Sequence, residues 1–305
     1  MKPVVVVGSM NVDLVAQVEQ IPSPGQTVSG RQFAIHSGGK GANQAVAVSR
    51  LGAPCTFLSR RGADLFGPQL VQSLQAAGVN TEHVEPTSST SGTALIVVAD
   101  NGQNSIVVTP GANADVTVVY LASKADLLRQ AGMVLAQLEI PLASVEWLGS
   151  FCHEAGVPFM LDPAPARKLP ASLFPLISWF TPNETEAAFY AGGATGEEEV
   201  LERLFAMGLQ RVVLKQGERG SLVADAAGAR IRIAPHAVTA VDTTAAGDVF
   251  NGAFAVGLAR GSDAAASARL ASVASALSVT RHGAQPSMPS AQEVEAALAA
   301  DAAKA

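Results

Sequence analysis

The sequence predicts a three-layer α/β/α fold with a mainly parallel central sheet, and three observations lead to this prediction. Short apolar runs rich in β-branched residues are typical of strands that are buried on both faces. Segments with helical apolar spacing separate these runs, as in repeated βαβ units. No low-complexity linker interrupts the 305 residues. We therefore expect one α/β domain over residues 1–305, to which a small antiparallel sheet is added.

The first expected strand is Val4 to Val7, an all-apolar run that ends at Gly8. Similar runs follow at Cys55 to Ser59, Met133 to Leu138, Val157 to Leu161 and Val212 to Lys215. The helical segments between them are Ala42 to Leu51, Phe66 to Ala77, Leu142 to Ala155 and Glu197 to Met207. Beyond Arg232 the spacing predicts helices over Gly247 to Arg260, Asp263 to Val279 and Ser290 to Lys304.

Two stretches break this alternation and predict the small antiparallel sheet. Thr93 to Val98 and Ser105 to Thr109 flank Asp100-Asn101-Gly102, which is a strong hairpin-turn signal. Asn11 to Val18 and Gln26 to Ile35 are also expected to be extended. A small sheet needs cover for its apolar face. We expect the inserted segments, about 11–37 and 92–110, to form a lid that closes over a ligand and packs against a second copy of the chain in a homodimer.

Composition argues against several classes of partner. The net charge is -6 and aromatic residues make up 5%, whereas a nucleic-acid-binding surface needs a basic face. No apolar run reaches the roughly 18 residues of a membrane-spanning helix, and no export signal is evident. The two cysteines, Cys55 and Cys152, fit free thiols in a reducing compartment. We expect a cytoplasmic protein that binds neither nucleic acid nor membranes.

The segment from Asp242 to Asp248 places small residues directly before an expected helix. Such residues leave backbone N–H groups unobstructed, and the positive end of the helix dipole makes them an anion site. A carboxylate beside that site, here Asp248, can accept a proton from a hydroxyl while the amides bind the anion under attack, a layout suited to phosphoryl transfer. The alternative is that Asp248 only stabilises the first turn of its own helix.

Two further polar segments precede expected helices. Ser37 to Asn43 is rich in glycine but is no Walker A loop, since its lysine is followed by glycine. It either brings the backbone close to a ligand, with Asn43 as donor and acceptor, or is an ordinary loop. Asn183 and Glu186 have the spacing of an N-cap and its N3 glutamate, and they also lie where open α/β sheets bind ligands.

Taken together, these segments resemble the PfkB family of carbohydrate kinases over nearly the whole chain. The segments that match the family in order and spacing are Gly8 to Asp13 with Pro24 to Val28, Gly38 to Gln44, Asp162 to Ala166, Thr181 to Glu186, Asp242 to Gly252 and Thr280 to Ser287. The resemblance implies the family's fold and an ATP-dependent kinase that phosphorylates D-ribose at its 5-hydroxyl. Another sugar or nucleoside kinase of the family, or a noncatalytic sugar or nucleotide sensor, remains as an alternative.

The resemblance also implies roles for individual residues. Asp248 would be the general base, and the N–H groups of Ala245, Ala246 and Gly247 would stabilise charge on the transferring phosphoryl group. The residues that would bind ribose are Asn11, Asp13, Gly39, Lys40, Gly41, Asn43, Glu139 and Asp248 itself. Those that would bind the nucleotide are Asn183, Lys215, Gln216, Gly217, Glu218, Arg219, Gly220, Gly247 and Ser272.

The same resemblance implies two kinds of cation beside the ATP. Glu186 would help to organise Mg²⁺ through water, because Mg²⁺ keeps much of its hydration shell. A K⁺ activator would lie beside the anion site and be held mostly by backbone carbonyls. Its ligands would come from Asp242, Thr244, Ser278, Arg281, Gly283 and Ser287. The alternative for residues 280–287 is a plain loop between helices.

Overall fold

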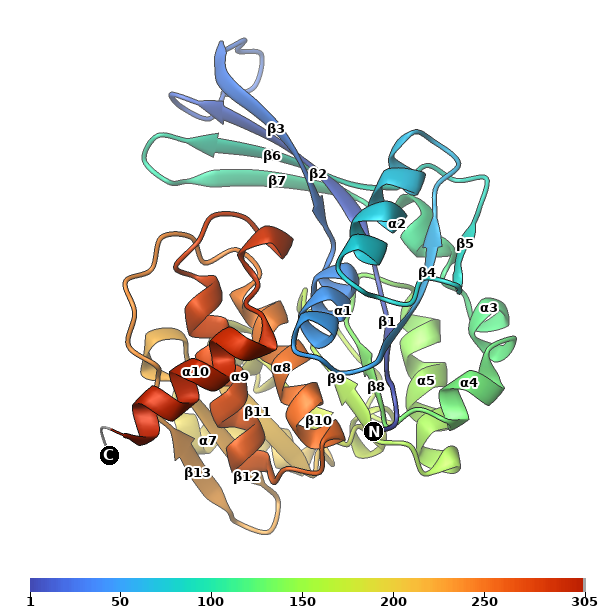
Figure 1. Cartoon of the computed structure of the whole chain (residues 1–305), viewed down its shortest axis with the longest axis vertical. Helices are drawn as coiled ribbons and strands as arrows, with labels where there is room; N and C mark the ends of the chain where they lie inside the picture. The colour runs from blue at the N-terminus through green and yellow to red at the C-terminus, as the bar shows by residue number, and fades with distance from the viewer. Residues whose placement is uncertain (304–305) are drawn as a thin grey trace.

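The computed structural model describes residues 1–303 and contains two sheets of different size (Figure 1). The large sheet has the strand order β13-β12-β11-β10-β9-β8-β1-β4-β5. From β11 to β5 neighbouring strands pair in parallel, and β12 runs antiparallel to both of its neighbours. The strands are β1 (Val4–Val7), β4 (Cys55–Arg61), β5 (Val84–Pro86), β8 (Met133–Ala136), β9 (Phe159–Leu161), β10 (Trp179–Phe180), β11 (Arg211–Lys215), β12 (Ser221–Asp225) and β13 (Arg230–Ile233).

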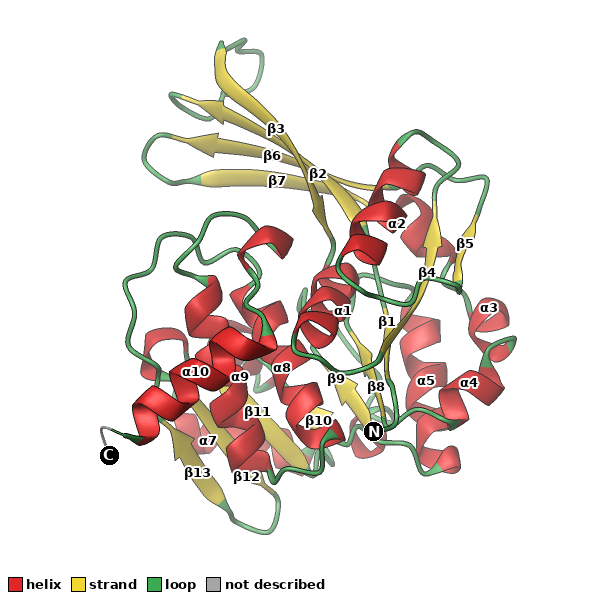
Figure 2. Cartoon of the chain, in the orientation of Figure 1, coloured by secondary structure: helices red, strands yellow, loops and turns green. Residues whose placement is uncertain are grey.

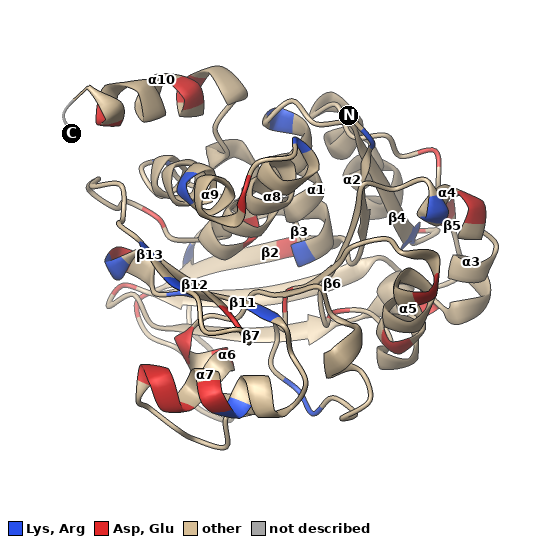
Figure 3. Ribbon diagram, turned by 90° about the horizontal axis from the view of Figure 1, so that it is seen from below, with Lys and Arg blue, Asp and Glu red and all other residues tan. Residues whose placement is uncertain are grey.

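Helices cover both faces of the large sheet, because alternate residues of each buried strand point to opposite faces. Val4 and Val6 of β1 belong to one apolar cluster, and Val5 and Val7 belong to another. The first cluster is covered by α1 (Lys40–Arg50), α2 (Phe66–Ala76), α8 (Ala246–Ala259), α9 (Ala264–Ser278) and α10 (Ala291–Ala302). The second is covered by α3 (Val118–Ala122), α4 (Ala125–Arg129), α5 (Leu142–Ala155), α6 (Glu184–Tyr190) and α7 (Glu197–Ala206). Figure 3 shows this order, with α8 and α9 on one side of the strands and α6 and α7 on the other.

The predicted three-layer fold is therefore confirmed, and most predicted elements appear within a few residues of their expected bounds. The sequence does not predict the short strand β5, the antiparallel pair β12 and β13, or the one-turn helices α3 and α4. Short 3₁₀ helices also occur, at Gly111–Asp115, Phe174–Leu176, Gly217–Arg219 and Gln285–Ser287. The expected end of the last helix, Lys304, lies outside the described residues. No helix in residues 1–303 is long and apolar enough to cross a membrane.

The small sheet has the strand order β3-β2-β6-β7 and projects beyond one end of the large sheet (Figures 1 and 2). Its strands are β2 (Asn11–Val18), β3 (Gly30–Gly38), β6 (Gly92–Ala99) and β7 (Asn104–Thr109). The two hairpins are antiparallel, as the sequence predicts, and they join through a parallel pairing of β2 with β6. β2 and β6 are the first strands of the two hairpins. Both run away from the body of the protein, and they therefore pair in parallel.

Candidate active site

The parallel strands of the large sheet end at one edge, and polar residues follow them directly. Gly8 follows β1, Gln137 follows β8, Asp162 follows β9, and Lys215 is the last residue of β11. Open α/β sheets bind their ligands at this edge. A cavity of about 860 Å³ lies here, a volume typical of small-molecule sites. Residues that line it include Lys40, Asp162, Asn183, Glu186, Lys215, Thr243, Ala245, Ala246, Gly247, Asp248 and Ser272.

Asp248 lies in the first turn of α8, at the wall of this cavity, and is 5% exposed. Its Oδ2 accepts a hydrogen bond from Asn43 Nδ2 at 3.0 Å, and its Oδ1 accepts one from Gln44 Nε2 at 3.1 Å. Burial raises the pKa of the Asp248 carboxyl above its ordinary value, although the Lys40 ammonium opposes the shift. A carboxylate with a raised pKa that reaches a cavity is suited to accept a proton.

The turn before α8 presents backbone amides to the same cavity. Ala245 has φ 60° and ψ 11°, in the left-handed region that residues other than glycine rarely adopt. In residues 1–303 the N–H groups of Ala245, Gly247 and Asp248 donate to no protein acceptor, and no side chain caps the helix. They therefore remain available to an anion at the positive end of α8.

The structure differs from the sequence prediction for the N–H group of Ala246. This group donates to the Thr243 carbonyl at 3.2 Å. The left-handed residue between them folds the chain back and brings the carbonyl to the amide. Of the three expected donors, Ala245 and Gly247 are thus the ones whose N–H groups are free within the described chain.

The residues expected to bind the sugar lie near the point where the chain passes from β1 of the large sheet to β2 of the small sheet. Asp13 lies on β2, and burial, together with the charges of Glu139 and Asp248, raises the pKa of its carboxyl to about 7. Glu139 accepts hydrogen bonds from the Ser9 hydroxyl at 2.5 Å and from the Lys40 N–H at 3.0 Å. The carboxylates of Asp13, Glu139 and Asp248 are therefore near one another. All three could accept hydrogen bonds from hydroxyl groups, and together they make an unusual concentration of negative charge.

The ammonium group of Lys40 offsets this charge. The charges of Asp248, Asp162, Glu139 and Glu186 raise the pKa of the Lys40 amine, outweighing the opposite effect of burial. Lys40 therefore stays protonated at neutral pH. Lys40 also lines the cavity, so its charge acts both on the residues expected to bind the sugar and at the anion site.

Asn11 and Asn43 are both buried and held by other amides. Asn11 Oδ1 accepts a hydrogen bond from Asn113 Nδ2 at 2.7 Å. Asn43 Oδ1 accepts one from Gln285 Nε2 at 3.3 Å, which directs the Asn43 NH₂ group to Asp248. Their side chains are thus fixed before any ligand binds.

Glycines allow the start of α1 to pack closely against the connection between β1 and β2. Gly39 has φ 89°, and a Cβ there would lie 2.7 Å from Met10 Cα. A Cβ at Gly41 would lie 2.6 Å from backbone atoms of Gly8 and Ser9. The close approach requires glycine at both positions, because real Cβ atoms do not come so near.

The residues expected at the nucleotide fall into two groups. Those that line the cavity are Asn183, Lys215, Gly217, Glu218, Gly220, Gly247 and Ser272. Gln216 and Arg219 do not, in contrast to the sequence prediction. Gln216 Nε2 donates to Glu197 at 2.8 Å, and the Arg219 guanidinium pairs with Glu184. The partner of Gln216 belongs to α7 and that of Arg219 to α6.

Glu186 also lines the cavity, and its geometry fits a site for a hydrated divalent cation. Its Oε2 accepts the Asn183 N–H at 2.8 Å, so the pair forms the predicted cap of α6. Burial raises the pKa of the Glu186 carboxyl, although Lys215 opposes the shift. Residues 1–303 contain no cluster of three or more His, Cys, Asp or Glu that could hold a metal by itself. A hard cation here would need phosphate and water oxygens besides the carboxylate.

Asp242 connects the two segments expected to hold K⁺, residues 242–244 and 278–287, through hydrogen bonds. Its Oδ1 accepts the Thr244 N–H at 2.9 Å, and its Oδ2 accepts the Gly283 N–H at 2.8 Å. The carbonyl oxygens of these three residues accept no hydrogen bond within the described chain, so they remain available to a cation. Other expected ligands have side chains engaged elsewhere, through the contacts Arg281 to Glu293, Ser278 to Ser275 and Ser287 to Ala284.

Three buried residues belong to the site although the sequence assigns them no role. Asp162 is 1% exposed, and its Oδ1 lies 3.1 Å from Lys215 Nζ. Gln44 donates to Asp162 and Asp248, and Gln137 donates to Gln44. Asp162 has a signal in the sequence, since it directly follows an expected strand. Gln44 ends the segment Gly38 to Gln44 that resembles the family, whereas Gln137 has no signal, because its partner is distant in the chain.

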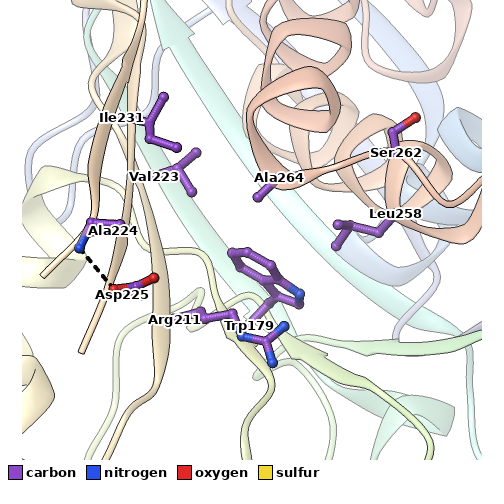
Figure 4. Close-up of a pocket in the computed structure, with 10 residues that line it drawn as sticks. Trp179, Arg211, Val223, Ala224, Asp225, Ile231, Leu258, Ser262 and Ala264 are labelled. Atoms are coloured by element: carbon purple, nitrogen blue, oxygen red, sulfur yellow. Dashed lines mark hydrogen bonds between the residues drawn. The ribbon is translucent and has the colours of Figure 1, made fainter. Parts of the chain in front are cut away.

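A second cavity, of about 370 Å³, lies between the strands β10 to β13 and the connection of α8 to α9 (Figure 4). Apolar side chains such as Val223 and Leu258 line most of it. The Arg211 guanidinium lies over the Trp179 ring, 5.1 Å from its centroid. None of the residues expected to act in phosphoryl transfer lines this cavity.

Comparisons with known proteins agree with this geometry. Residues 1–291 match the family described as pfkB family carbohydrate kinase. Ribokinase of Bacillus subtilis (strain 168) is 41% identical over 300 residues, which cover 98% of this chain and 100% of that protein. The structure of ribokinase from Thermotoga maritima is similar, with a TM-score of 0.91 and 34% identity over 98% of this chain and 100% of that one. The structure of Arabidopsis thaliana ribokinase complexed with ribose and ATP gives a TM-score of 0.91 and 32% identity over 97% of this chain and 98% of that one.

Proposed function

Because the chain belongs to the pfkB family of carbohydrate kinases, we propose that it transfers the γ-phosphoryl group of ATP to the 5-hydroxyl of D-ribose. One observation carries the proposal, within a ribokinase-like three-layer fold. The buried carboxylate of Asp248 lies beside the free amides of Ala245 and Gly247, between the cavity and the cluster of Asp13 and Glu139.

In this proposal Asp248 is the general base. A carboxylate oxygen accepts the proton of the 5-hydroxyl as that oxygen bonds to the γ-phosphorus, and the bond from γ-phosphorus to the bridging oxygen of ADP breaks. The N–H groups of Ala245 and Gly247 stabilise the negative charge on the phosphoryl oxygens, and the positive end of α8 adds to this. General-base catalysis typically contributes about 10² to 10⁴-fold, and loss of one preorganised donor costs roughly 3 to 4 kcal/mol.

Ribose would lie between the small sheet and the start of α1. Asn11, Asp13, Asn43 and Glu139 present carboxylate and amide groups, each of which can bridge two hydroxyls of a small polyol. Gly39 and Gly41 permit the backbone at Lys40 to approach the sugar, and the Lys40 ammonium compensates the charge of the carboxylates. The small sheet would close over the sugar as a lid and exclude water from the reaction.

ATP would occupy the cavity of about 860 Å³. Lys215 and Asn183 would bind its phosphates, Gly217 and Gly220 would allow close approach of the backbone, and Ser272 would lie near the adenine. Glu186 would hold Mg²⁺ through water, and this ion would neutralise phosphate charge. Carbonyl oxygens of Asp242, Thr244 and Gly283, with Ser278, Arg281 and Ser287 nearby, would hold K⁺, which would add positive charge beside the anion site.

The lid is also proposed to form a homodimer with the lid of a second copy. Phe33, Ile35 and Val107 are 61%, 53% and 59% exposed. In the strand register Ile35 pairs with Leu14, so an apolar surface extends across neighbouring strands. An exposed apolar patch of this kind marks an interaction surface. A cytoplasmic location remains a prediction, supported by Cys55 and Cys152, which are buried and free.

The test is an assay of ADP release with ATP, Mg²⁺ and K⁺ across D-ribose, 2-deoxy-D-ribose, D-fructose and adenosine. We expect the highest kcat/KM with D-ribose and a product identified by NMR as the 5-phosphate. A higher kcat/KM with another acceptor would assign the chain to a different activity within the family. Tight sugar and ATP binding without ADP release would instead indicate a sensor.

A further inference from the structure

Gln44 connects two buried carboxylates at the centre of the proposed site. Its Nε2 donates to Asp162 Oδ2 at 2.8 Å and to Asp248 Oδ1 at 3.1 Å. Gln44 is 0% exposed and Asp162 is 1% exposed. Both N–H bonds of one amide group are therefore used to hold two negative charges close together, away from water.

A second glutamine donates a hydrogen bond to the oxygen of the Gln44 amide. Gln137 directly follows β8, is 0% exposed, and donates from its Nε2 to Gln44 Oε1 at 2.5 Å. A rotation of the Gln44 amide by half a turn would place Oε1 against the carboxylates of Asp162 and Asp248, so these two acids set the orientation in which Nε2 faces them. Gln137 Nε2 satisfies the Gln44 oxygen that this orientation turns away from the acids, whereas the buried Oε1 of Gln137 has no hydrogen-bond partner in the described chain.

The bridge also links the proposed base to the phosphate end of the cavity. Asp162 Oδ1 lies 3.1 Å from Lys215 Nζ, and a Cβ at Gly247 would lie 3.6 Å from the same nitrogen. Lys215 therefore lies between the buried acid and the anion turn. Without a donor between them, the like charges of Asp162 and Asp248 would favour movement of one carboxylate or its protonation.

We propose that Gln44 is a positioning residue, which keeps the Asp248 carboxylate ionised and directed at the acceptor hydroxyl, and that Gln137 acts through Gln44. The inference rests on the proposed kinase function and deepens it. The inference concerns the general base and not the choice of sugar. Its test therefore uses the acceptor that gives the highest kcat/KM with the wild-type protein.

The first test is Gln44→Met, which keeps the length of the side chain and removes the amide. We expect kcat to fall about 10- to 100-fold, as for loss of a hydrogen bond to a charged group, with KM for sugar and ATP little changed. The acid limb of the kcat profile should move to higher pH, because a donor that favours the ionised form of Asp248 is lost. The other charged groups that act on Asp248, which stay in place, are Lys40 on α1, Asp162 after β9 and Asp13 on β2.

The second test is a double-mutant cycle with Gln137→Met. If Gln137 acts through Gln44, Gln137→Met lowers kcat in the wild-type background but has no further effect in Gln44→Met. Ser144→Ala is the matched control, since Ser144 is also fully buried and bonded, to the Val116 carbonyl at 2.6 Å, on the other face of the sheet. It should lower Tm and leave kcat and its pH profile unchanged.

Three results would overturn the inference. The first is that Gln44→Met has the kcat of the wild type and the acid limb of its pH profile does not move. The second is that the losses of kcat in Gln44→Met and Gln137→Met are additive in the double mutant. The third applies if Gln44→Met does not fold, so that only Gln137→Met can be measured. A normal kcat and pH profile in Gln137→Met would then overturn the inference. A wild-type protein that releases no ADP with any sugar is a different result, which removes the proposed function and this inference together.

Discussion

Asn43 at the start of α1 and Asp248 at the start of α8 meet through a hydrogen bond of 3.0 Å, although 205 positions separate them in the chain. The first turns of two helices therefore converge on one carboxylate. Each helix brings its positive end to the same point, which favours negative charge there. This convergence places the proposed base where both a sugar hydroxyl and a phosphate can reach it.

Asp248→Asn should abolish nearly all turnover. The amide keeps the size of the side chain but cannot accept the proton, so we expect kcat to fall by about 10² to 10⁴-fold. Ribose binding should remain largely intact, because the other expected sugar ligands Asn11 and Glu139 keep partners that do not include Asp248. Kinetics of ADP release and calorimetric titration with ribose measure the two effects. Turnover near that of the wild type would refute the assignment of Asp248 as the base.

The pKa of Asp13, which is raised to about 7, predicts a pH dependence of sugar binding. The ionised carboxylate accepts hydrogen bonds from two hydroxyls, whereas the protonated form accepts fewer. KM for ribose should therefore rise as the pH falls below about 7. Asp13→Asn should have a high KM that no longer changes over this range. A wild-type KM that is constant from pH 6 to 8 would contradict a role of Asp13 in binding.

The same group should affect stability in the opposite sense. Its pKa in the folded protein, about 7, lies above the ordinary value of 3.8, so folding favours the protonated acid. The stability it contributes is complete below pH 3.8 and is lost progressively up to about pH 7. Asp13→Asn should therefore raise Tm, by an amount that grows over this pH range and then levels off.

Much of the fold follows from local signals in the sequence. The run Val4–Val7 is apolar at every position because the strand lies in the middle of a sheet covered on both faces. The turn at Gly102 has φ 81°, as the Asn-Gly pair predicts. The caps at Asn183 and Ser290 both form with a glutamate three residues later. Each of these features depends on residues that are neighbours in the chain.

What the sequence does not predict depends on partners that are distant in the chain. β13 contains Arg230 and Arg232 because it lies at an edge of the sheet, where these side chains reach Glu198 and Glu197 of α7. The same kind of pairing joins Arg219, which does not line the cavity, to Glu184 of α6. The role of Gln44 depends on carboxylates more than a hundred positions away. No spacing rule within one sequence describes such contacts.

Replacement of K⁺ by Na⁺ should lower kcat markedly. The carbonyl oxygens of Asp242, Thr244 and Gly283 accept no hydrogen bond in the described chain, so they can bind a weakly hydrated cation, and the charge of that cation would favour an anion at the turn before α8. Asp242→Ala removes the bonds to Thr244 and Gly283, so the response to K⁺ should be lost together with part of the activity. Initial rates at equal ionic strength with each salt measure the effect. Equal rates in K⁺ and Na⁺ would remove this element of the proposal.

Phe33→Glu should separate the proposed dimer. The change puts a charge on the exposed apolar surface of the lid, where Phe33 is 61% exposed, and burial of an unpaired charge between two lids is costly. Light scattering at micromolar concentration should give about 31.1 kDa for the variant and twice this mass for the wild type. Gln32→Glu, at an exposed position next to it, is the control and should keep the dimer mass. A monomeric wild type would refute the dimer.

Gly39→Ala should reduce both stability and turnover. Residue 39 has φ 89°, and a Cβ there would lie 2.7 Å from Met10 Cα, so both the backbone and its neighbour must move. Crowding of this kind typically costs about 1 to 3 kcal/mol. The shift would carry Lys40 and Asn43 away from Glu139 and Asp248, and kcat should therefore fall more than the loss of Tm explains.

Gly228→Ala provides the matched control for this prediction. Residue 228 also has a positive φ, of 106°, but no atom lies within 4 Å of the added Cβ. It should therefore lower Tm through backbone strain alone and leave kcat unchanged at temperatures well below Tm. If the two variants instead keep the same kcat, the close approach of α1 to the connection between β1 and β2 does not position the site.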